Sequence, residues 1–311
     1  MTQTNKKTLH ERNFHNDRYD FKALIQSEPS LNEFVKPNKY GDLSIDFANP
    51  QAVIALNKDL LSFFYGIKNW SIPSDYLCPP IPGRSDYIHH IADLLAASNG
   101  GKIPKGSNIK GLDVGIGANC IYPIVGVSVY GWSFTGSDID EVALKSAQNI
   151  INSNESLKEN IIVKLQTNSK NIFKNIISKE DKFDFTLCNP PFHKSQKDAI
   201  AGNKRKVQNL TKQVVSKAAL NFGGKHNELW CEGGEVAFIK KMIKESKEFS
   251  KNCLWFTTLV SRKENLDFIY DALEDIDVLE YKTINMANGQ KISRVIAWTF
   301  LTQDEQKAWT K

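Results

Sequence analysis

The chain has 311 residues, of which 41% are hydrophobic and 24% are charged, and its formal net charge is +5. This composition is typical of a globular protein and argues against an integral membrane protein, because no stretch approaches the roughly 20 apolar residues that span a bilayer. The first residues also lack the apolar core of a secretory signal. The five cysteines form no Cys-x-x-Cys pair, which argues against a disulfide framework or a zinc site. We therefore expect a cytoplasmic protein with reduced thiols.

Residues 1–107 show no regular alternation of strands and helices, and they are predicted to form a helical and loop-rich extension. Asn49-Pro50 is a typical helix start, and apolar residues recur at helical spacing after it. The proline-rich segment Cys78–Gly83 is predicted to be a stiff extended linker. It leads to Arg84 at the start of a second helix over Ser85–Ala97.

From about residue 108 onward, short apolar runs alternate with amphipathic stretches, which indicates a doubly wound α/β sheet. Parallel strands are predicted over Ile109–Val114, Trp132–Ser137, Ile161–Leu165, Phe183–Cys188 and Cys253–Leu259. The runs Asp277–Ile284 and Arg294–Leu301 flank an Asn-Gly dipeptide, which favours a hairpin and predicts a terminal antiparallel pair. We expect a seven-stranded, mostly parallel sheet in one domain over residues 108–311.

A glycine-rich turn, Asp113-Val114-Gly115-Ile116-Gly117, follows the first predicted strand. Glycines between a strand and a helix let a ligand approach the backbone and the amides of the helix start. Asp138 ends the second strand, where it can accept hydrogen bonds from ribose hydroxyls. A turn of small residues would also explain the glycines, and Asp138 or Asp140 could be an acid at a helix N-terminus. Together the two features favour a nucleoside cofactor held by Asp113, Gly115, Ile116, Gly117 and Asp138.

The turn after the fourth predicted strand, Asn189-Pro190-Pro191-Phe192, carries the most specific chemical signal. Two prolines directly after a strand impose a rigid turn. The Asn189 side-chain oxygen and the Pro190 carbonyl can accept both protons of an exocyclic amine, which favours a pyramidal nitrogen with an exposed lone pair. Phe192 offers a flat face on which an extruded base can stack. An ordinary Asn-Pro turn with a buried phenylalanine is the alternative interpretation.

Positive charge is concentrated directly after this turn. Residues 193–225 contain eight cations and one anion, a net charge of +7, so the rest of the chain is slightly negative. A basic segment beside a reactive turn favours binding of a phosphate backbone, whereas a solvated lysine-rich loop is the alternative. The cations that we expect to contact nucleic acid here are Lys194, Lys204, Arg205 and Lys206.

The order of the Asp113–Gly117 turn, Asp138 and the Asn189–Phe192 turn resembles the class I methyltransferases that use S-adenosylmethionine and modify amino groups. Blocks outside this core resemble the bacterial 23S ribosomal RNA adenine N6-methyltransferase family, namely Leu9–His15, Arg18–Phe21, Pro79–His89 and Glu232–Glu235. With these blocks the resemblance spans nearly the whole chain. The family is also related to eukaryotic enzymes that methylate adenine in small nuclear RNA.

The resemblance implies a Rossmann-like methyltransferase fold and N6-methylation of one adenine in 23S ribosomal RNA or in a large-subunit assembly intermediate. Asn189 would then border both the cofactor and the amine. Arg84 would hold the cofactor carboxylate, although an arginine tied to Asp86 or to solvent is the alternative. No metal is implied, a monomer is expected, and RNA phosphates would be bound in the N-terminal block by Lys6, Lys7, Arg12 and Arg18.

Two other functions stay open for this sequence. A protein glutamine N-methyltransferase would use the same acceptors on a side-chain amide, although it would have little use for the basic segment. A non-catalytic ribosome-assembly factor could retain the methyltransferase fold. Binding of S-adenosylmethionine and methyl transfer to RNA would separate the second alternative from an enzyme.

Overall fold

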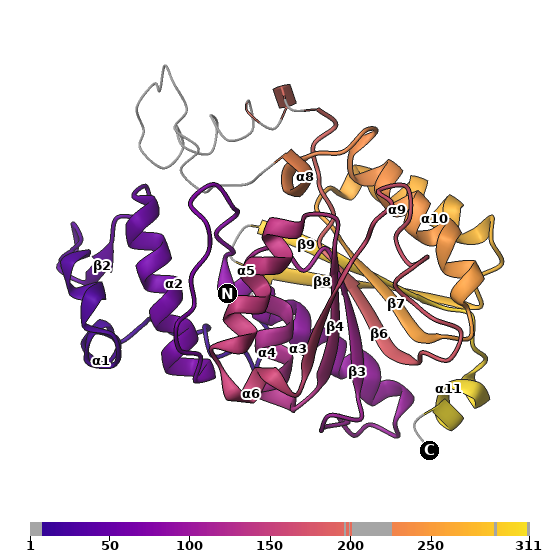
Figure 1. Cartoon of the computed structure of the whole chain (residues 1–311), viewed down its shortest axis with the longest axis horizontal. Coiled ribbons are helices and arrows are strands. Elements are labelled where there is room, and N and C mark those ends of the chain that lie inside the picture. The colour runs from indigo at the N-terminus through magenta and orange to yellow at the C-terminus, as the bar shows by residue number, and fades with distance from the viewer. Residues whose placement is uncertain (1–7, 196, 199, 201–225, 289–290, 310–311) are drawn as a thin grey trace, which may run out of the picture.

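One seven-stranded sheet forms the centre of the computed structural model, which describes residues 8–195, 197, 198, 200, 226–288 and 291–309 (Figure 1). The strands are β3 (Lys110–Val114), β4 (Ser133–Asp138), β5 (Ile161–Leu165), β6 (Phe183–Cys188), β7 (Cys253–Val260), β8 (Glu280–Asn288) and β9 (Lys291–Thr299). They lie in the order β5-β4-β3-β6-β7-β9-β8. The pairs from β5 to β7 are parallel, so the predicted α/β fold class is confirmed.

The terminal antiparallel pair is also confirmed, and its placement has a physical reason. β9 runs antiparallel to both β7 and β8 and lies between them, so β8 forms the edge of the sheet. Every residue from Val295 to Trp298 is fully buried, which suits a central strand. β8 instead has exposed residues such as Tyr281, which suits a strand with one free edge.

Helices cover both faces of the sheet. α3 (Ile81–Ser98), α4 (Ile121–Tyr130) and α5 (Glu141–Asn152) lie on one side, whereas α9 (Gly234–Ser246) and α10 (Leu266–Glu274) lie on the other (Figure 1). Successive side chains of a strand point to opposite faces, and two core clusters result. Leu112 and Val114 of β3 pack in one cluster with α9 and α10, and Phe185 and Leu187 of β6 pack in the other with α3 and α4.

The N-terminal extension is helical, as expected, but it also contains a small sheet. Its elements are α1 (Phe21–Ser27), η1 (Pro29–Glu33), β1 (Val35–Pro37), β2 (Leu43–Ile45) and α2 (Pro50–Tyr65). Asn49 caps α2 by accepting hydrogen bonds from the amides of Gln51 and Ala52, which confirms the predicted helix start. β1 and β2 pair antiparallel, which the sequence analysis did not anticipate.

The extension shares a core with the sheet. Leu24, Leu56 and Trp70 belong to the same cluster as Ile124 and Val125 of α4. The boundary between residues 107 and 108 therefore stays a prediction, since this cluster crosses it.

The predicted linker over Cys78–Gly83 is wrong in its second half. α3 begins at Ile81, so Pro82 and Gly83 belong to its first turn and Arg84 lies inside the helix. Proline is tolerated there because the first amides of a helix have no intrahelical acceptor. The Arg84 amide donates to the Pro80 carbonyl at 3.3 Å and makes the first intrahelical bond.

The remaining elements are short, namely α6 (Glu155–Lys158), α8 (His226–Leu229), η2 (Lys247–Phe249), η3 (Lys263–Asn265) and α11 (Gln303–Trp309). All five cysteines are free thiols, and only Cys231 is not buried, as the sequence predicted. In the described part of the chain, no helix combines the length and the apolar character needed to cross a membrane.

Candidate active site

A cavity of about 810 Å³ opens at the carboxyl ends of β3, β4 and β6. It is lined by the Gly115–Gly117 turn, by Asp138, by Asn189 and Pro191, and by Arg84 from α3. Ligands of doubly wound sheets bind in this position, where the connections above neighbouring strands separate. The predicted cofactor site and the predicted amine site therefore border one cavity.

The glycine turn presents its main chain to the cavity. Gly115 and Gly117 have φ angles of +77° and +64°, in the left-handed region that favours glycine. The amides of Gly115 and Ile116 donate to the Ser137 carbonyl at 2.8 and 2.9 Å and fix the turn to β4. A Cβ atom at Gly115 would meet no atom within 4 Å, so the space above this residue is open to a ligand.

Asp138 and Asp140 have different structural roles. Asp140 is the N-cap of α5, because its carboxylate accepts from the amides of Val142 and Ala143 at 2.9 and 3.3 Å. Asp138 lines the cavity and accepts from the amides of Gly117 and Asp140 at 2.9 and 3.0 Å. Burial raises the pKa of Asp138, and the two amide bonds oppose that shift. Each of its oxygens retains a lone pair for ligand hydroxyl groups.

Asp113 lies beneath the cavity beside a cation. Its carboxylate is 1% exposed, and neither oxygen has a hydrogen-bond partner among the described residues. Burial raises the pKa of Asp113 well above its usual value, nearby Asp138 adds to the shift, and Arg84 opposes it. Arg84 lines the cavity and donates to the Tyr122 hydroxyl at 2.9 Å. A ligand with an amino-acid end fits this pair, because its carboxylate can meet Arg84 and its ammonium charge can offset Asp113.

The Asn189–Phe192 turn keeps its acceptors available. No described residue is hydrogen-bonded to the Asn189 side chain or to the Pro190 carbonyl, and Asn189 is half-buried in the cavity wall. Phe192 does not line the cavity, and its ring centroid lies 4.5 Å from that of His193. His193, the residue after the turn, connects it to α8, because its amide donates to the Leu229 carbonyl at 3.1 Å.

Two segments of the cavity wall were missed by the sequence analysis. Residues 166–172 follow β5, and residues from Glu228 to Lys241 follow the basic stretch. The first could have been found from its place after a parallel strand, since such connections line the crevice. The second includes Glu232 of the Glu232–Glu235 block, which carried the family resemblance but was not predicted to line the site. Glu228 belongs to it through a tertiary contact, in which its carboxylate accepts from the Leu77 amide at 3.1 Å.

The predicted RNA-binding cations have different surroundings. Lys194 is exposed, and Arg18 is exposed and forms an ion pair with Asp42 at 2.8 Å. The others apart from Arg12 lie outside the described residues, namely Lys6, Lys7, Lys204, Arg205 and Lys206.

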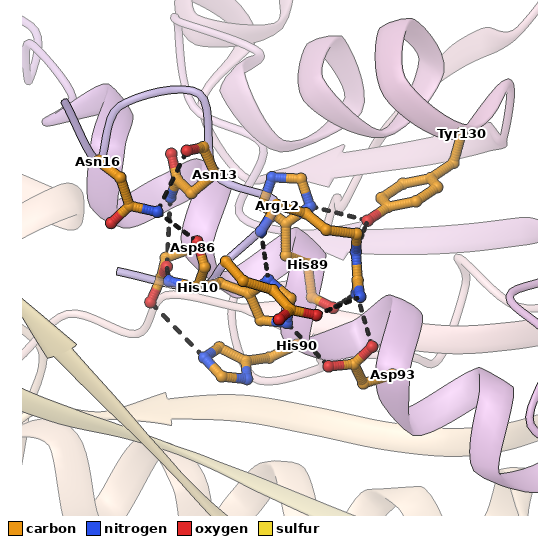
Figure 2. Close-up of polar contacts among 10 residues, drawn as sticks. His10, Arg12, Asn13, Asn16, Asp86, His89, His90, Asp93 and Tyr130 are labelled. Carbon is orange, nitrogen blue, oxygen red and sulfur yellow. Dashed lines mark hydrogen bonds and ion pairs between the residues drawn. The ribbon is translucent and has the colours of Figure 1, made fainter. Parts of the chain in front are cut away.

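Arg12 belongs to a polar cluster that fixes the N-terminal segment to α3 (Figure 2). Its side chain donates to the Asp93 carboxylate at 2.6 Å, to the His89 carbonyl at 3.1 Å and to the Tyr130 hydroxyl at 3.2 Å. Only 31% of its side chain is exposed. These contacts account for Arg12 without RNA, so its contact with RNA stays a prediction.

His10, His90 and Asp93, in the same cluster, place metal-ligating atoms within 4.8 Å of one another. However, His10 Nδ1 accepts from the Arg12 amide at 3.1 Å, which leaves the proton on Nε2. Nε2 then donates to Asp93 at 2.8 Å. A metal-bound histidine usually donates from its other ring nitrogen, and here that nitrogen is an acceptor. The geometry therefore favours a hydrogen-bonded network over a metal site.

Comparisons with known proteins show the family of the chain. A family model described as RNA methyltransferase matches residues 3–302. Proteins named Ribosomal RNA large subunit methyltransferase F are similar to the chain. That of Photobacterium profundum is 54% identical over 98% of this chain and 95% of its own length. That of Serratia proteamaculans is 57% identical over 98% of this chain and 91% of its own length.

Solved structures of METTL16 share the fold. The hMettl16 catalytic domain in complex with MAT2A 3'UTR hairpin 6 superposes with a TM-score of 0.79 at 29% identity, and the match covers 95% of this chain and 98% of that one. The N-terminal domain of human METTL16 in complex with SAH gives a TM-score of 0.75 at 26% identity over 95% and 100%. With a matching family model over nearly its whole length and relatives above half identity, the chain belongs to the RNA methyltransferase family.

Proposed function

We propose that this protein transfers a methyl group from S-adenosylmethionine to the N6 amine of one adenine in 23S ribosomal RNA. The observation that carries the proposal is the Asn189 turn. Asn189 lines a cavity that also holds the glycine turn and Asp138, and neither its side chain nor the adjoining Pro190 carbonyl is hydrogen-bonded to a described residue. The names of the relatives support ribosomal RNA as the substrate, and the SAH complex of METTL16 supports the cofactor.

The residues that line the cavity, with Asp113 beneath it, support S-adenosylmethionine as the ligand. Asp138 is placed for the ribose hydroxyls, and the Gly115–Gly117 main chain allows close approach of the ligand. Arg84 and Asp113 suit the carboxylate and the ammonium group at the amino-acid end. When bound, the cofactor supplies an electrophilic methyl group on its sulfonium centre.

The Asn189 turn acts on the adenine amine. The N6 lone pair is delocalised into the ring, so the amine is a weak nucleophile until hydrogen bonds draw it out of conjugation. The Asn189 side-chain oxygen and the Pro190 carbonyl accept one N6 proton each and direct the lone pair into the cavity. No strong base is required, because the nitrogen becomes acidic only after it has gained the methyl group. Phe192, which is half-buried outside the cavity, offers a face for the extruded adenine.

RNA is held mainly by phosphate contacts in this proposal. The basic stretch over residues 193–225 follows the Asn189 turn directly in the sequence, which favours phosphate contacts near the reacting base. Lys194 and Arg18 are exposed, and contact with a phosphate would require Arg18 to exchange its ion pair with Asp42. The substrate is 23S ribosomal RNA or a large-subunit assembly intermediate, and we propose that the protein acts as a cytoplasmic monomer without a metal.

The Asn189→Ala variant tests this function. Loss of one preorganised hydrogen-bond partner typically lowers turnover about 10²- to 10³-fold, so methyl transfer to ribosomal RNA should fall by at least about 10²-fold. Transfer of tritiated methyl groups is the measurement, with circular dichroism and RNA binding as checks on folding. Asn49→Ala is the matched control, because it removes the cap of α2 at a cost of about 1 kcal/mol and should retain activity. Unimpaired turnover by Asn189→Ala would remove the amine chemistry from this turn.

A further inference from the structure

One buried carboxylate of α9 holds the cavity wall that follows β5. Glu245 is 8% exposed, and its Oε1 accepts from the amides of Ile172, Phe173 and Lys174 at 3.1, 2.8 and 2.7 Å. Its Oε2 also accepts from the Ile172 amide, at 3.0 Å. Three successive main-chain amides thus surround one anion, an arrangement known as a nest. The carboxylate gives these amides the acceptor that buried main chain requires.

Residues 166–174 are also held by hydrogen bonds within the segment and by a second residue of α9. Gln166 spans it, because its side chain donates to the Lys174 carbonyl at 2.7 Å and accepts from the Asn168 amide at 3.1 Å. Lys241, one turn before Glu245 on α9, donates to the Ser169 carbonyl at 2.9 Å. Lys241 therefore binds a carbonyl near the start of the loop, and Glu245 binds amides at its end.

This loop borders the nucleoside part of the cavity. The Gln166 amide donates to the Asp138 carbonyl at 2.8 Å, so the loop begins directly beside the proposed ribose acceptor. Residues 169–172 then line the cavity, whereas Glu245 does not. If Asp138 holds the ribose of a nucleoside, we expect its base to lie against this wall.

We propose that Glu245 is a positioning residue for the cofactor, which acts by holding residues 169–172 against its nucleoside. The inference rests on the proposed function, since it takes S-adenosylmethionine as the ligand. Without the carboxylate, the buried amides of Ile172 and Phe173 and the part-buried amide of Lys174 lose their acceptor, and the loop leaves its place to satisfy them. If the loop is then ordered in about a tenth of the molecules, the apparent affinity for the cofactor falls about 10-fold.

The test compares Glu245→Ala and Glu245→Gln with the unchanged protein. Titration calorimetry with S-adenosylmethionine should show a Kd about 10-fold higher for Glu245→Ala. Glu245→Gln should be affected less, because its amide oxygen can still accept from Phe173 and Lys174. In methyl-transfer assays the KM for the cofactor should rise more than kcat falls. A role in folding alone would instead lower the active fraction at constant KM.

Glu235 provides a matched control on the same helix. It is 4% exposed and likewise accepts from a loop, through the Ser261 amide at 2.7 Å and the Asn265 side chain at 2.5 Å. Neither of these partners lines the cavity. Glu235→Ala should therefore lower thermal stability and leave the cofactor Kd unchanged. A wild-type Kd for Glu245→Ala, or an equal rise in Kd for Glu235→Ala, would overturn the positioning role. Failure of the unchanged protein to bind S-adenosylmethionine would instead refute the proposed function, and this role with it.

Discussion

Replacing Asp138 by alanine tests the cofactor site through its best-defined side chain. The carboxylate lines the cavity, and amide bonds at 2.9 and 3.0 Å from Gly117 and Asp140 fix its orientation. Hydrogen bonds from ribose hydroxyls to a charged group contribute about 1.5 to 3 kcal/mol. Their loss should raise the Kd for S-adenosylmethionine about 10- to 150-fold. Loss of the bond to the Gly117 amide also loosens the glycine turn, which acts in the same direction.

Asp140→Ala is the matched control for this measurement, because Asp140 is the same residue type only two positions away. It caps α5 and does not line the cavity, so its removal should lower stability by about 1 kcal/mol without weakening cofactor binding. Isothermal titration gives the Kd, and thermal unfolding gives the stability of each variant. An unchanged Kd for Asp138→Ala, or an equal rise for Asp140→Ala, would refute the assignment of the ribose contact to Asp138.

Two further predictions concern charge. Neutralising Lys204, Arg205 and Lys206 together should weaken RNA binding and make it less dependent on salt. The slope of log affinity against log salt concentration should become shallower by roughly 0.7 for each phosphate of single-stranded RNA that is no longer neutralised. An unchanged slope would show that this stretch does not contact RNA phosphates. Burial lowers the pKa of both His15 and His89 from 6.5 to about 4. The unfolded chain therefore binds protons that the folded protein does not, and stability should fall as the pH drops from about 6.5 to about 4, by up to about 3 kcal/mol per histidine. Asp59, whose pKa burial raises to about 7, acts in the opposite direction, so the histidines are followed individually. NMR titration of the two imidazoles is the measurement, and an imidazole that titrates near 6.5 would contradict its neutral, buried state.

The sheet could be predicted because each strand has a signal within its own few residues. Ile161–Leu165 and Phe183–Cys188 are short apolar runs with polar or proline boundaries, and the structure has the same bounds. The start of α3 was harder to predict, because proline and glycine are unfavourable inside a helix, whereas Pro82 and Gly83 lie in its first turn, where they are tolerated. The pairing of β1 with β2 was missed because strands of three residues are too short to show a period.

The candidate site likewise has residues that the sequence could identify and residues that it could not. The glycine turn, Asp138 and Asn189 are recognisable residue types directly after predicted strands, so the sequence could locate them at the cavity. The wall over residues 166–172 could not be identified by residue type, because its position depends on main-chain amides and on a carboxylate more than 70 residues away. The sequence also did not reveal that Arg12 contacts Asp93, because the two residues are more than 80 positions apart; its contact with RNA stays a prediction.

The most direct test of the central claim is mass-spectrometric mapping of N6-methyladenine in 23S ribosomal RNA from a strain that lacks this gene and from its parent. The account predicts loss of one N6-methyladenine, restored by the unchanged gene and not by the Asn189→Ala variant. An identical N6-methyladenine map in the two strains would contradict it.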